Sequence, residues 1–167
     1  MKFSKVKLEL VREKDFDYNY QKLFKASEVV KYIKEIEGLD RLAEELCFVV
    51  CLDIENRVLA YSEVAKGGTE ICPVDMKSIF KISLMCNSSR IIVIHNHPSG
   101  SATPSKYDLD VTKKIKKACE LMNVTLLDHI VVGESNFCSC LIWVNIRKWN
   151  IVDNFLSSCF LIKNWRN

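Results

Sequence analysis

Several patterns that mark common protein classes are missing from the sequence. Its eight cysteines include no Cys-x-x-Cys pair, which excludes zinc ribbons and the zinc deaminases, because both use such a pair to hold their metal. There is no glycine-rich phosphate loop, no internal repeat and no low-complexity tract. There is also no signal peptide and no apolar run long enough to span a membrane. We therefore expect a cytoplasmic protein with reduced cysteines and no membrane partner.

The length and the charge of the chain set further bounds. Its 167 residues, 49% of them hydrophobic, are enough for one domain with a proper core and too few for two domains of ordinary size. The net charge of +3 falls short of the strongly basic balance that indicates a nucleic-acid partner by itself. Local support for DNA binding comes from two groups of cations: Lys113, Lys114, Lys116 and Lys117, and Arg147, Lys148, Lys163 and Arg166. The first group is interpreted as the solvated face of a helix, because no aromatic residues are interleaved with it.

The residues that carry chemistry gather in one stretch in the middle of the chain. Residues 90–94 read Arg-Ile-Ile-Val-Ile and predict a short strand that is buried on both faces. This strand runs into His95 and His97. Side chains two residues apart in a strand point the same way, so the two imidazoles aim at one point. A loop with prolines and a glycine follows, and Ser105 with Asp108 then predicts the start of a helix.

Two imidazoles and a carboxylate are therefore expected to converge. His95, His97 and Asp108 offer donors of N, N and O type, which suit zinc and leave a fourth tetrahedral position for water. Each residue also has a simpler explanation, because a single histidine is more often a surface or core residue and Ser105-x-x-Asp108 is also typical of a helix cap. A cap, however, gives no reason for paired histidines at the end of a buried strand. The combination favours a metal site.

The spacing of these residues resembles that of a known family. His95-x-His97, followed after seven residues by Ser105-x-x-Asp108, is similar to the metal-binding signature of the JAMM (MPN-plus) metalloproteases. The resemblance implies a zinc-dependent hydrolase of peptide, isopeptide or related amide bonds, with zinc held by the two histidines and the aspartate. It implies that Ser105 supports the oxyanion of the tetrahedral intermediate. The implied fold is a single α/β domain, a mixed β-sheet flanked by helices in the JAMM and cytidine-deaminase-like architecture.

Two further sequence motifs narrow the resemblance to the RadC branch of that superfamily, a group traditionally called DNA repair proteins. They are His-Asn-His-Pro-Ser-Gly at 95–100 and Leu-Asp-His-Ile-Val-Val-Gly at 127–133. The likeness covers about residues 44–133. The expected layout is a lead-in strand and helix at 1–40, a JAMM-type RadC-like catalytic domain at 41–135, and a divergent extension at 136–167 that packs on or beside the same domain.

A general base is the remaining part of the expected site. It must be an acid at the start of a strand next to the histidine-bearing strand, so that its carboxylate reaches the water without binding the metal. Glu45 fits best, because it directly precedes the apolar strand 46–52, as the family glutamate precedes its own. Glu44 is one residue away, and a one-residue shift reverses the face to which a strand side chain points. Glu63 and Glu70 are weaker candidates.

The remaining patterns predict the elements around the site. Strands are expected at 6–11, 46–52, 57–64, 90–95 and 124–132, and helices are expected to begin at Ser27, Asp75 and Ser105. His129, inside the last strand, is a rival third ligand, but a core histidine bonded to a carboxylate or to the backbone is the preferred interpretation. The apolar segment 155–162 is a helix that covers the core, a partner-binding surface or a divergent end that packs poorly.

Three functions from different classes remain open on the sequence. The first is the zinc hydrolase, with a peptide or another amide as substrate. The second is a DNA-associated repair module, and the third is a catalytically silent MPN-type interaction domain that keeps the fold. No pattern in the sequence indicates an oligomeric state.

Overall fold

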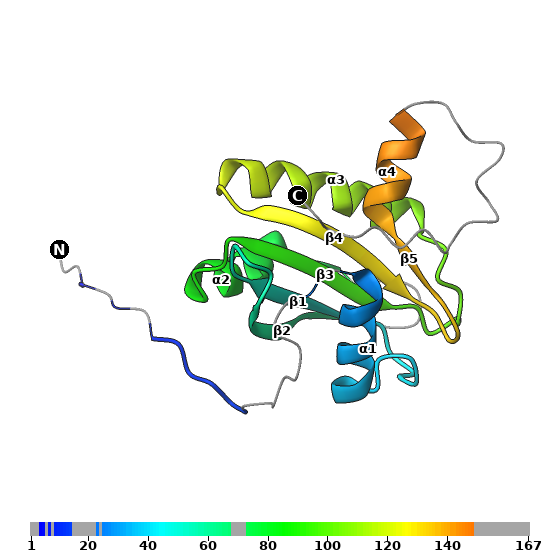
Figure 1. The fold of residues 1–167 in the computed structure, drawn as a ribbon, viewed down its shortest axis with the longest axis horizontal. Helices are drawn as coiled ribbons and strands as arrows, with labels where there is room; N and C mark the ends of the chain where they lie inside the picture. The colour runs from blue at the N-terminus through cyan, green and yellow to red at the C-terminus, as the bar shows by residue number, and fades with distance from the viewer. Residues whose placement is uncertain are drawn as a thin grey trace.

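The structure is a computed structural model that describes residues 4–5, 7, 9–14, 23, 25–67 and 73–148, the last four of these by their backbone alone. Four helices and five strands occupy these residues (Figure 1). In chain order they are α1 (Ala26–Glu37), β1 (Leu46–Leu52), β2 (Val58–Lys66), α2 (Met76–Met85), β3 (Arg90–Asn96), α3 (Lys106–Leu121), β4 (Thr125–Val132), β5 (Phe137–Ser139) and α4 (Cys140–Lys148).

The five strands form one mixed sheet in the order β2-β1-β3-β4-β5. Only β3 and β4 are parallel, and the other three neighbouring pairs are antiparallel. Helix α3 provides the crossover between the two parallel strands, so the carboxyl ends of β3 and β4 lie at the same edge of the sheet. The prediction of a single α/β domain with a mixed sheet flanked by helices is confirmed.

Helices cover both faces of the central strands, which explains why β1 and β3 are apolar at almost every position. Successive side chains of a strand point to opposite faces, so each strand contributes to two cores. One core packs α1 against Phe48, Val50, Leu52, Ile92 and Ile94. The other packs α2 and α3 against Cys47, Val49, Cys51, Ile91 and Val93. The site described below lies where this doubly covered layer ends.

Two of the three predicted helix starts, Asp75 and Ser105, are the observed caps, whereas α1 begins at Ala26, one residue before the predicted Ser27. Helix α1 ends at Gly38, which has a φ of 63° and therefore takes the left-handed conformation that glycine tolerates best. Asp75 begins α2 by accepting a hydrogen bond from the Lys77 backbone N–H. Ser105 begins α3 in the same way. Strand β2 ends at Lys66, two residues beyond the end of the strand predicted at 57–64.

The strand predicted at 6–11 is wrong for the residues of that range that are described. Residues 7 and 9–11 are exposed and belong to no strand, and Val11 is 82% exposed. Alternation of apolar and charged residues indicates a strand only if a neighbouring strand supplies hydrogen bonds, and no described strand pairs with these residues. Glu70, the segment 155–162, Lys163 and Arg166 lie outside the described residues. The division at residues 40 and 135 stays a prediction.

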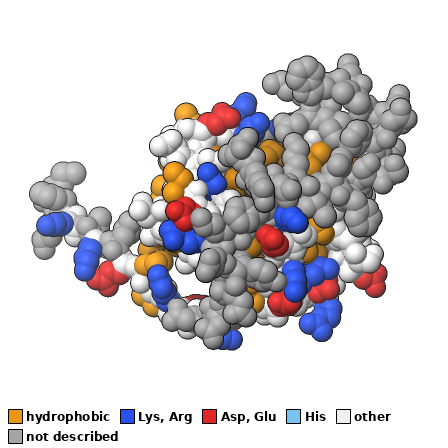
Figure 2. Space-filling view, viewed as in Figure 1, with side chains coloured by type: hydrophobic (Ala, Val, Ile, Leu, Met, Phe, Trp, Pro, Cys, Tyr) orange, Lys and Arg blue, Asp and Glu red, His pale blue; other side chains and the backbone are white. Residues whose placement is uncertain are grey.

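The cysteines and lysines of the described region are placed as expected. Cys51, Cys86, Cys119 and Cys140 are free thiols, and burial raises the pKa of the Cys119 thiol to about 12. The four lysines named above, Lys113, Lys114, Lys116 and Lys117 of α3, are exposed to solvent. On the face shown in Figure 2, basic and acidic side chains are interspersed rather than separated. Among the helices that the structure describes, none is long and apolar enough to cross a membrane.

Candidate metal centre

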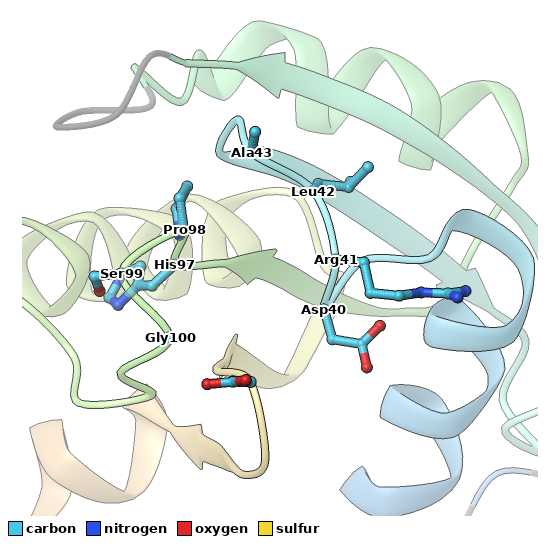
Figure 3. Close-up of a pocket in the computed structure, with 9 residues that line it drawn as sticks. Asp40, Arg41, Leu42, Ala43, His97, Pro98, Ser99 and Gly100 are labelled. Carbon is cyan, nitrogen blue, oxygen red and sulfur yellow. The ribbon is translucent and has the colours of Figure 1, made fainter.

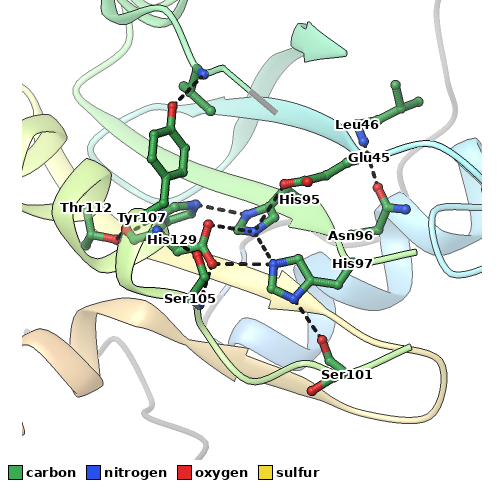
Figure 4. A network of polar contacts seen from close by, with 12 residues as sticks. Glu45, Leu46, His95, Asn96, His97, Ser101, Ser105, Tyr107, Thr112 and His129 are labelled. Atoms are coloured by element: carbon green, nitrogen blue, oxygen red, sulfur yellow. Dashed lines mark hydrogen bonds and ion pairs between the residues drawn. The ribbon is translucent and has the colours of Figure 1, made fainter. Parts of the chain in front are cut away.

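The two histidines meet at the end of β3, as their spacing predicts (Figure 4). His95 is buried in the last part of the strand, and His97 lies just beyond it, where its backbone N–H still bonds to the Val132 carbonyl of β4. The Nε2 atoms of the two imidazoles are 3.2 Å apart. Alternation in the strand and continued pairing with β4 therefore bring both rings to one point.

Asp108 comes to the same point from the first turn of α3. Its Oδ1 lies 3.3 Å from His95 Nε2 and its Oδ2 lies 3.4 Å from His97 Nε2. Asp108 also forms a capping box with Ser105: the Ser105 backbone N–H donates to Asp108 Oδ2 at 2.6 Å, and the Asp108 backbone N–H donates to Ser105 Oγ at 3.1 Å. The helix cap and the site are therefore not alternatives. The cap is what holds the carboxylate toward the imidazoles.

The hydrogen bonds behind His97 determine which of its nitrogens carries a proton. Its Nδ1 lies 2.9 Å from the backbone carbonyl oxygen of Ser101. A carbonyl oxygen only accepts, so Nδ1 must carry the hydrogen. In the neutral ring the lone pair is then on Nε2, which faces the cluster.

A longer chain of bonds determines the tautomer of His95. The Thr112 hydroxyl donates its one proton to the Asp108 carbonyl at 2.6 Å, so it can only accept from His129 Nδ1, which is 2.7 Å away. Burial lowers the pKa of His129 to about 3, so this ring is neutral and its Nε2 holds a lone pair. That Nε2 lies 3.0 Å from His95 Nδ1 and accepts its proton. The lone pair of His95 is therefore on Nε2, toward the cluster.

Three acceptors thus face one another with no donor between them. The separations among His95 Nε2, His97 Nε2 and the Asp108 carboxylate oxygens are 3.2, 3.3 and 3.4 Å. Nitrogen and oxygen ligands at 2.0–2.2 Å from a tetrahedral metal are about 3.3 to 3.6 Å from each other. The two imidazoles contact different oxygens of Asp108, and each pair of atoms has the spacing of two ligands of one metal ion. Lone pairs this close repel unless a proton or a metal cation lies among them. The donor set fits a metal ion.

Glu45 is the fourth member of the cluster, and Glu44 is not part of it. The metal-binding atoms of Glu45, His95, His97 and Asp108 all lie within 4.8 Å of one another, a set that could hold a metal ion. Glu45 Oε1 is 3.9 Å from His95 Nε2, farther than the spacing of the other three donors. Glu44 instead pairs with Lys66 at the surface. The two neighbouring acids thus lie in different surroundings, and Glu45 is the one that faces the cluster.

The pKa values of the two carboxyl groups, Asp108 and Glu45, are shifted in opposite directions. Burial raises the pKa of Asp108, but the hydrogen bonds that His95 and His97 donate to it when their Nε2 atoms are protonated outweigh burial and hold the pKa well below its usual range. For Glu45 burial dominates over the charges of the two histidines, so its pKa is raised. For His97 burial lowers the pKa, yet the hydrogen bonds to Asp108 and to the Ser101 carbonyl outweigh it, so the pKa is above the usual value. Asp108 is thus ionised, whereas Glu45 is poised to take a proton.

Two polar residues of the site were missed in the sequence. Thr112 lies one helical turn after Asp108, a spacing that could have suggested contact with the same backbone. Asn96, between the histidines, points away from them and bonds to the backbone beside Glu45. His129 is a buried histidine as preferred, but its partners are a hydroxyl and an imidazole rather than a carboxylate or the backbone. Glu63 lies on the exposed side of β2.

A cavity of about 510 Å³ opens beside the cluster (Figure 3). His97 and the loop that follows it form one wall, and the segment between α1 and β1 forms another. The lining residues are Asp40, Arg41, Leu42, Ala43, His97, Pro98, Ser99, Gly100 and Glu134. A molecule bound in this cavity would lie next to His97.

Fold and site together define a class: an α/β domain in which the ends of two central strands and a helix carry two histidines and two acids that could hold a metal ion. Comparison with protein families makes the assignment specific. The model of the RadC-like JAB domain matches residues 23–142, which is most of the chain. The chain belongs to this family, as the resemblance of its motifs predicts.

Bacterial relatives agree with this assignment. A "UPF0758 protein" of Clostridium perfringens is 35% identical over 118 residues, which are 71% of this chain and 51% of the relative. A "UPF0758 protein" of Thermotoga maritima is 34% identical over 119 residues, covering 71% and 52%. One of Clostridium botulinum is 41% identical over 98 residues, covering 59% and 43%. The chain spans about half the length of these curated relatives.

Proposed function

We propose that this protein is a zinc-dependent hydrolase of peptide, isopeptide or related amide bonds. The observation that carries the proposal is the convergence of His95, His97 and Asp108, whose donor atoms lie 3.2 to 3.4 Å apart in pairs, with the buried carboxylate of Glu45 next to them. The two nitrogen donors and one oxygen donor are a set that suits zinc and leaves one coordination position open. Zinc at this cluster supplies Lewis acidity, which lowers the pKa of a water molecule toward 7 and polarises an amide carbonyl.

Glu45 is the proposed general base. Its carboxylate lies 3.9 Å from His95 Nε2, close enough to reach a water held at the cluster and farther away than the three ligand atoms are from each other. Burial raises its pKa, which moves it toward the neutral range where a general base works best. The same carboxylate can return the proton to the leaving nitrogen.

Ser105 is proposed to support the developing oxyanion. Its Oγ accepts a hydrogen bond from the Asp108 backbone N–H, so the hydroxyl proton remains to be donated. The residue is exposed at the start of α3, three residues before Asp108. A donor held in place before the reaction stabilises charge that appears only in the transition state.

The partner and the location belong to the same proposal. An amide substrate would occupy the cavity beside His97, whose walls combine apolar side chains with Asp40, Arg41 and Glu134. A cytoplasmic location is supported by the free thiols of Cys51, Cys86, Cys119 and Cys140. DNA binding has the weaker support of the exposed lysines of α3, one of which, Lys113, is paired with Asp110.

The first experiment measures metal content and hydrolysis together. We expect one zinc per chain in the purified protein by elemental analysis, and none in His97→Ala, because two remaining donors hold a catalytic metal poorly. Ser101→Ala is the matched control in the same loop, because the Ser101 group that bonds to His97 is the backbone carbonyl. A library of peptides and lysine isopeptides then reports hydrolysis. Equal zinc in wild type and His97→Ala would refute the proposal.

A further inference from the structure

Asn96 joins the metal-ligand strand to the backbone on both sides of Glu45. It is the last residue of β3 and is 2% exposed. Its side-chain Oδ1 accepts the backbone N–H of Leu46 at 2.8 Å (Figure 4). Its Nδ2 donates to the backbone carbonyl of Glu44 at 3.0 Å. The oxygen and the nitrogen of one amide side chain therefore bond to the backbone of the two residues that flank Glu45.

This pair of bonds extends the sheet by one step. Strands β1 and β3 pair from Leu52 with Arg90 to Cys47 with His95, and the pairing ends there. Beyond that point the Asn96 amide offers one acceptor and one donor, as a strand backbone would. From the other side, the Gly67 backbone N–H donates to the Glu45 carbonyl at 2.8 Å. The peptide groups around Glu45 are thus held from both neighbouring strands although the regular ladder has ended.

The consequence for Glu45 is a defined direction of its side chain. A residue with extended backbone sends its side chain out of the plane of the sheet, and its two neighbours send theirs to the opposite face. By holding the carbonyl of Glu44 and the N–H of Leu46, Asn96 fixes the peptide groups on both sides of Glu45, directly before β1. Glu45 then faces the cluster, whereas Glu44 faces Lys66. A turn or a one-residue slip here would exchange the two acids.

We propose that Asn96 is a positioning residue that holds the Glu45 carboxylate beside the metal ligands. The inference rests on the proposed function, because Glu45, the residue that Asn96 holds in place, is the general base of that proposal. The same strand end thus provides two opposite faces, with His95 and His97 directed at the metal and Asn96 directed at the segment that carries the base.

The test compares Asn96→Ala, Glu45→Gln and the double variant. We expect Asn96→Ala to keep zinc and KM and to lose kcat by about 10- to 100-fold, as is typical when a group behind a site residue is removed. Adding Asn96→Ala to Glu45→Gln should cause little further loss of kcat, because a misplaced base and an absent base have the same defect. A purely structural role would give additive losses, and additive losses would overturn the proposal.

Asn56→Gly is the matched control. Asn56 is also 2% exposed and bonds through Oδ1 to Arg90, at the opposite end of β3, and its φ of 65° suits glycine. This control should lower the thermal unfolding midpoint while leaving kcat within about twofold and additive with Glu45→Gln. If Asn96→Ala does not fold, Asn96→Ser serves instead, because its hydroxyl is too short to reach both backbone atoms.

Two measurements separate this inference from the proposed function. Hydrogen exchange of the Leu46 amide should be slow in wild type and much faster in the Asn96 variants. A crystal structure of Asn96→Ala should show the Glu45 carboxylate moved away from His95 Nε2. If wild type hydrolyses no amide, the proposed function fails and these two measurements still decide the positioning. If Asn96→Ala leaves both kcat and the Glu45 carboxylate unchanged, the inference fails and the function stands.

Discussion

Asp108, in the first turn of α3, and Asp128, in β4, are two aspartates with equal burial, each 5% exposed. We call their surroundings the Asp108 corner and the Asp128 corner. Asp128 lies where β4 meets β5 and α4. Its Oδ1 accepts from the His129 backbone N–H at 2.8 Å and from the Ser139 hydroxyl at 2.7 Å, and Ser139 Oγ in turn accepts the Ile142 backbone N–H at 3.2 Å. Each of these three hydrogen bonds joins a donor to an acceptor.

The corner around Asp108 is different in kind. Its carboxylate receives the Ser105 backbone N–H, but it also faces the lone pairs of His95 and His97. Burial alone therefore does not distinguish a structural acid from a site acid. The count of donors and acceptors does, because acceptors that face one another without a donor need a proton or a metal cation among them. Each prediction below tests one side of this difference.

The largest expected effect comes from making the same substitution at both corners. Asp108→Asn should reduce zinc affinity by more than about 100-fold, which is beyond the loss typical of groups behind a ligand, because it removes the one charged ligand. Asp128→Asn keeps an acceptor oxygen at Oδ1 and should leave zinc affinity unchanged. Titration with a competing chelator measures both. Similar affinity losses in the two variants would remove the distinction between the corners.

The second prediction concerns the neighbouring glutamates. Glu45→Gln should keep zinc and lose hydrolytic kcat by about 10²- to 10⁴-fold, the range for general-base catalysis. Glu44→Gln should be close to wild type, because Glu44 pairs with Lys66 at the surface. Steady-state kinetics on the best peptide or isopeptide substrate is the measurement. Loss of activity only in Glu44→Gln would show that Glu44, and not Glu45, is the general base.

The third prediction removes the group that determines the His95 tautomer. Thr112→Val preserves shape but leaves His129 Nδ1–H without its acceptor, so His129 can move its proton to Nε2 and repel His95 Nδ1–H. We expect zinc affinity to fall by about 10- to 100-fold. Nitrogen-15 NMR of the metal-free protein should show the altered His95 tautomer. The exposed Thr125→Val on β4 is the control, and equal zinc affinity in both variants would contradict the tautomer argument.

The fourth prediction is the pH dependence of metal binding. The pKa of His97 in the metal-free protein is raised because its hydrogen bonds to Asp108 and the Ser101 carbonyl outweigh burial. A proton competes with zinc for Nε2, so zinc affinity should be constant above the raised pKa and fall as pH decreases through it, by about tenfold per pH unit. The metal-free protein has the opposite dependence: the stability from His97 is fully present below its unfolded pKa and is lost as pH rises through the folded pKa. Chelator titrations and thermal unfolding across pH measure the two, and zinc affinity that does not change with pH would contradict the assignment.

The smallest effect is expected at the corner without a site. Asp128→Ala leaves the Ser139 hydroxyl and the His129 N–H without their acceptor, which should lower the free energy of unfolding by about 1–3 kcal/mol. Zinc content should stay at the wild-type value. Chemical denaturation and elemental analysis of the same preparation give both results. A loss of zinc in this variant would show that the two corners depend on each other.

Much of the fold was predictable because the signals are local. The continuous apolar run of β1 was assigned to Leu46–Leu52, as observed, since only a strand covered on both faces needs an apolar residue at each position. Helix starts at Asp75 and Ser105 follow from the hydrogen bonds of a cap within one turn. The strand at 6–11 was wrong because alternation says nothing about the presence of a partner strand.

The site itself divides in the same way. The sequence alone determined that His95 and His97 share a direction, because the period of two in a strand is a property of the backbone. It also determined that Ser105 and Asp108 begin a helix. Only the tertiary structure decided that Asp108 reaches both imidazoles, that Glu45 rather than Glu44 faces them, and that His129 and Thr112 orient His95. These contacts join residues from different elements, so they depend on how strands pair and where a helix crosses, which no local pattern encodes.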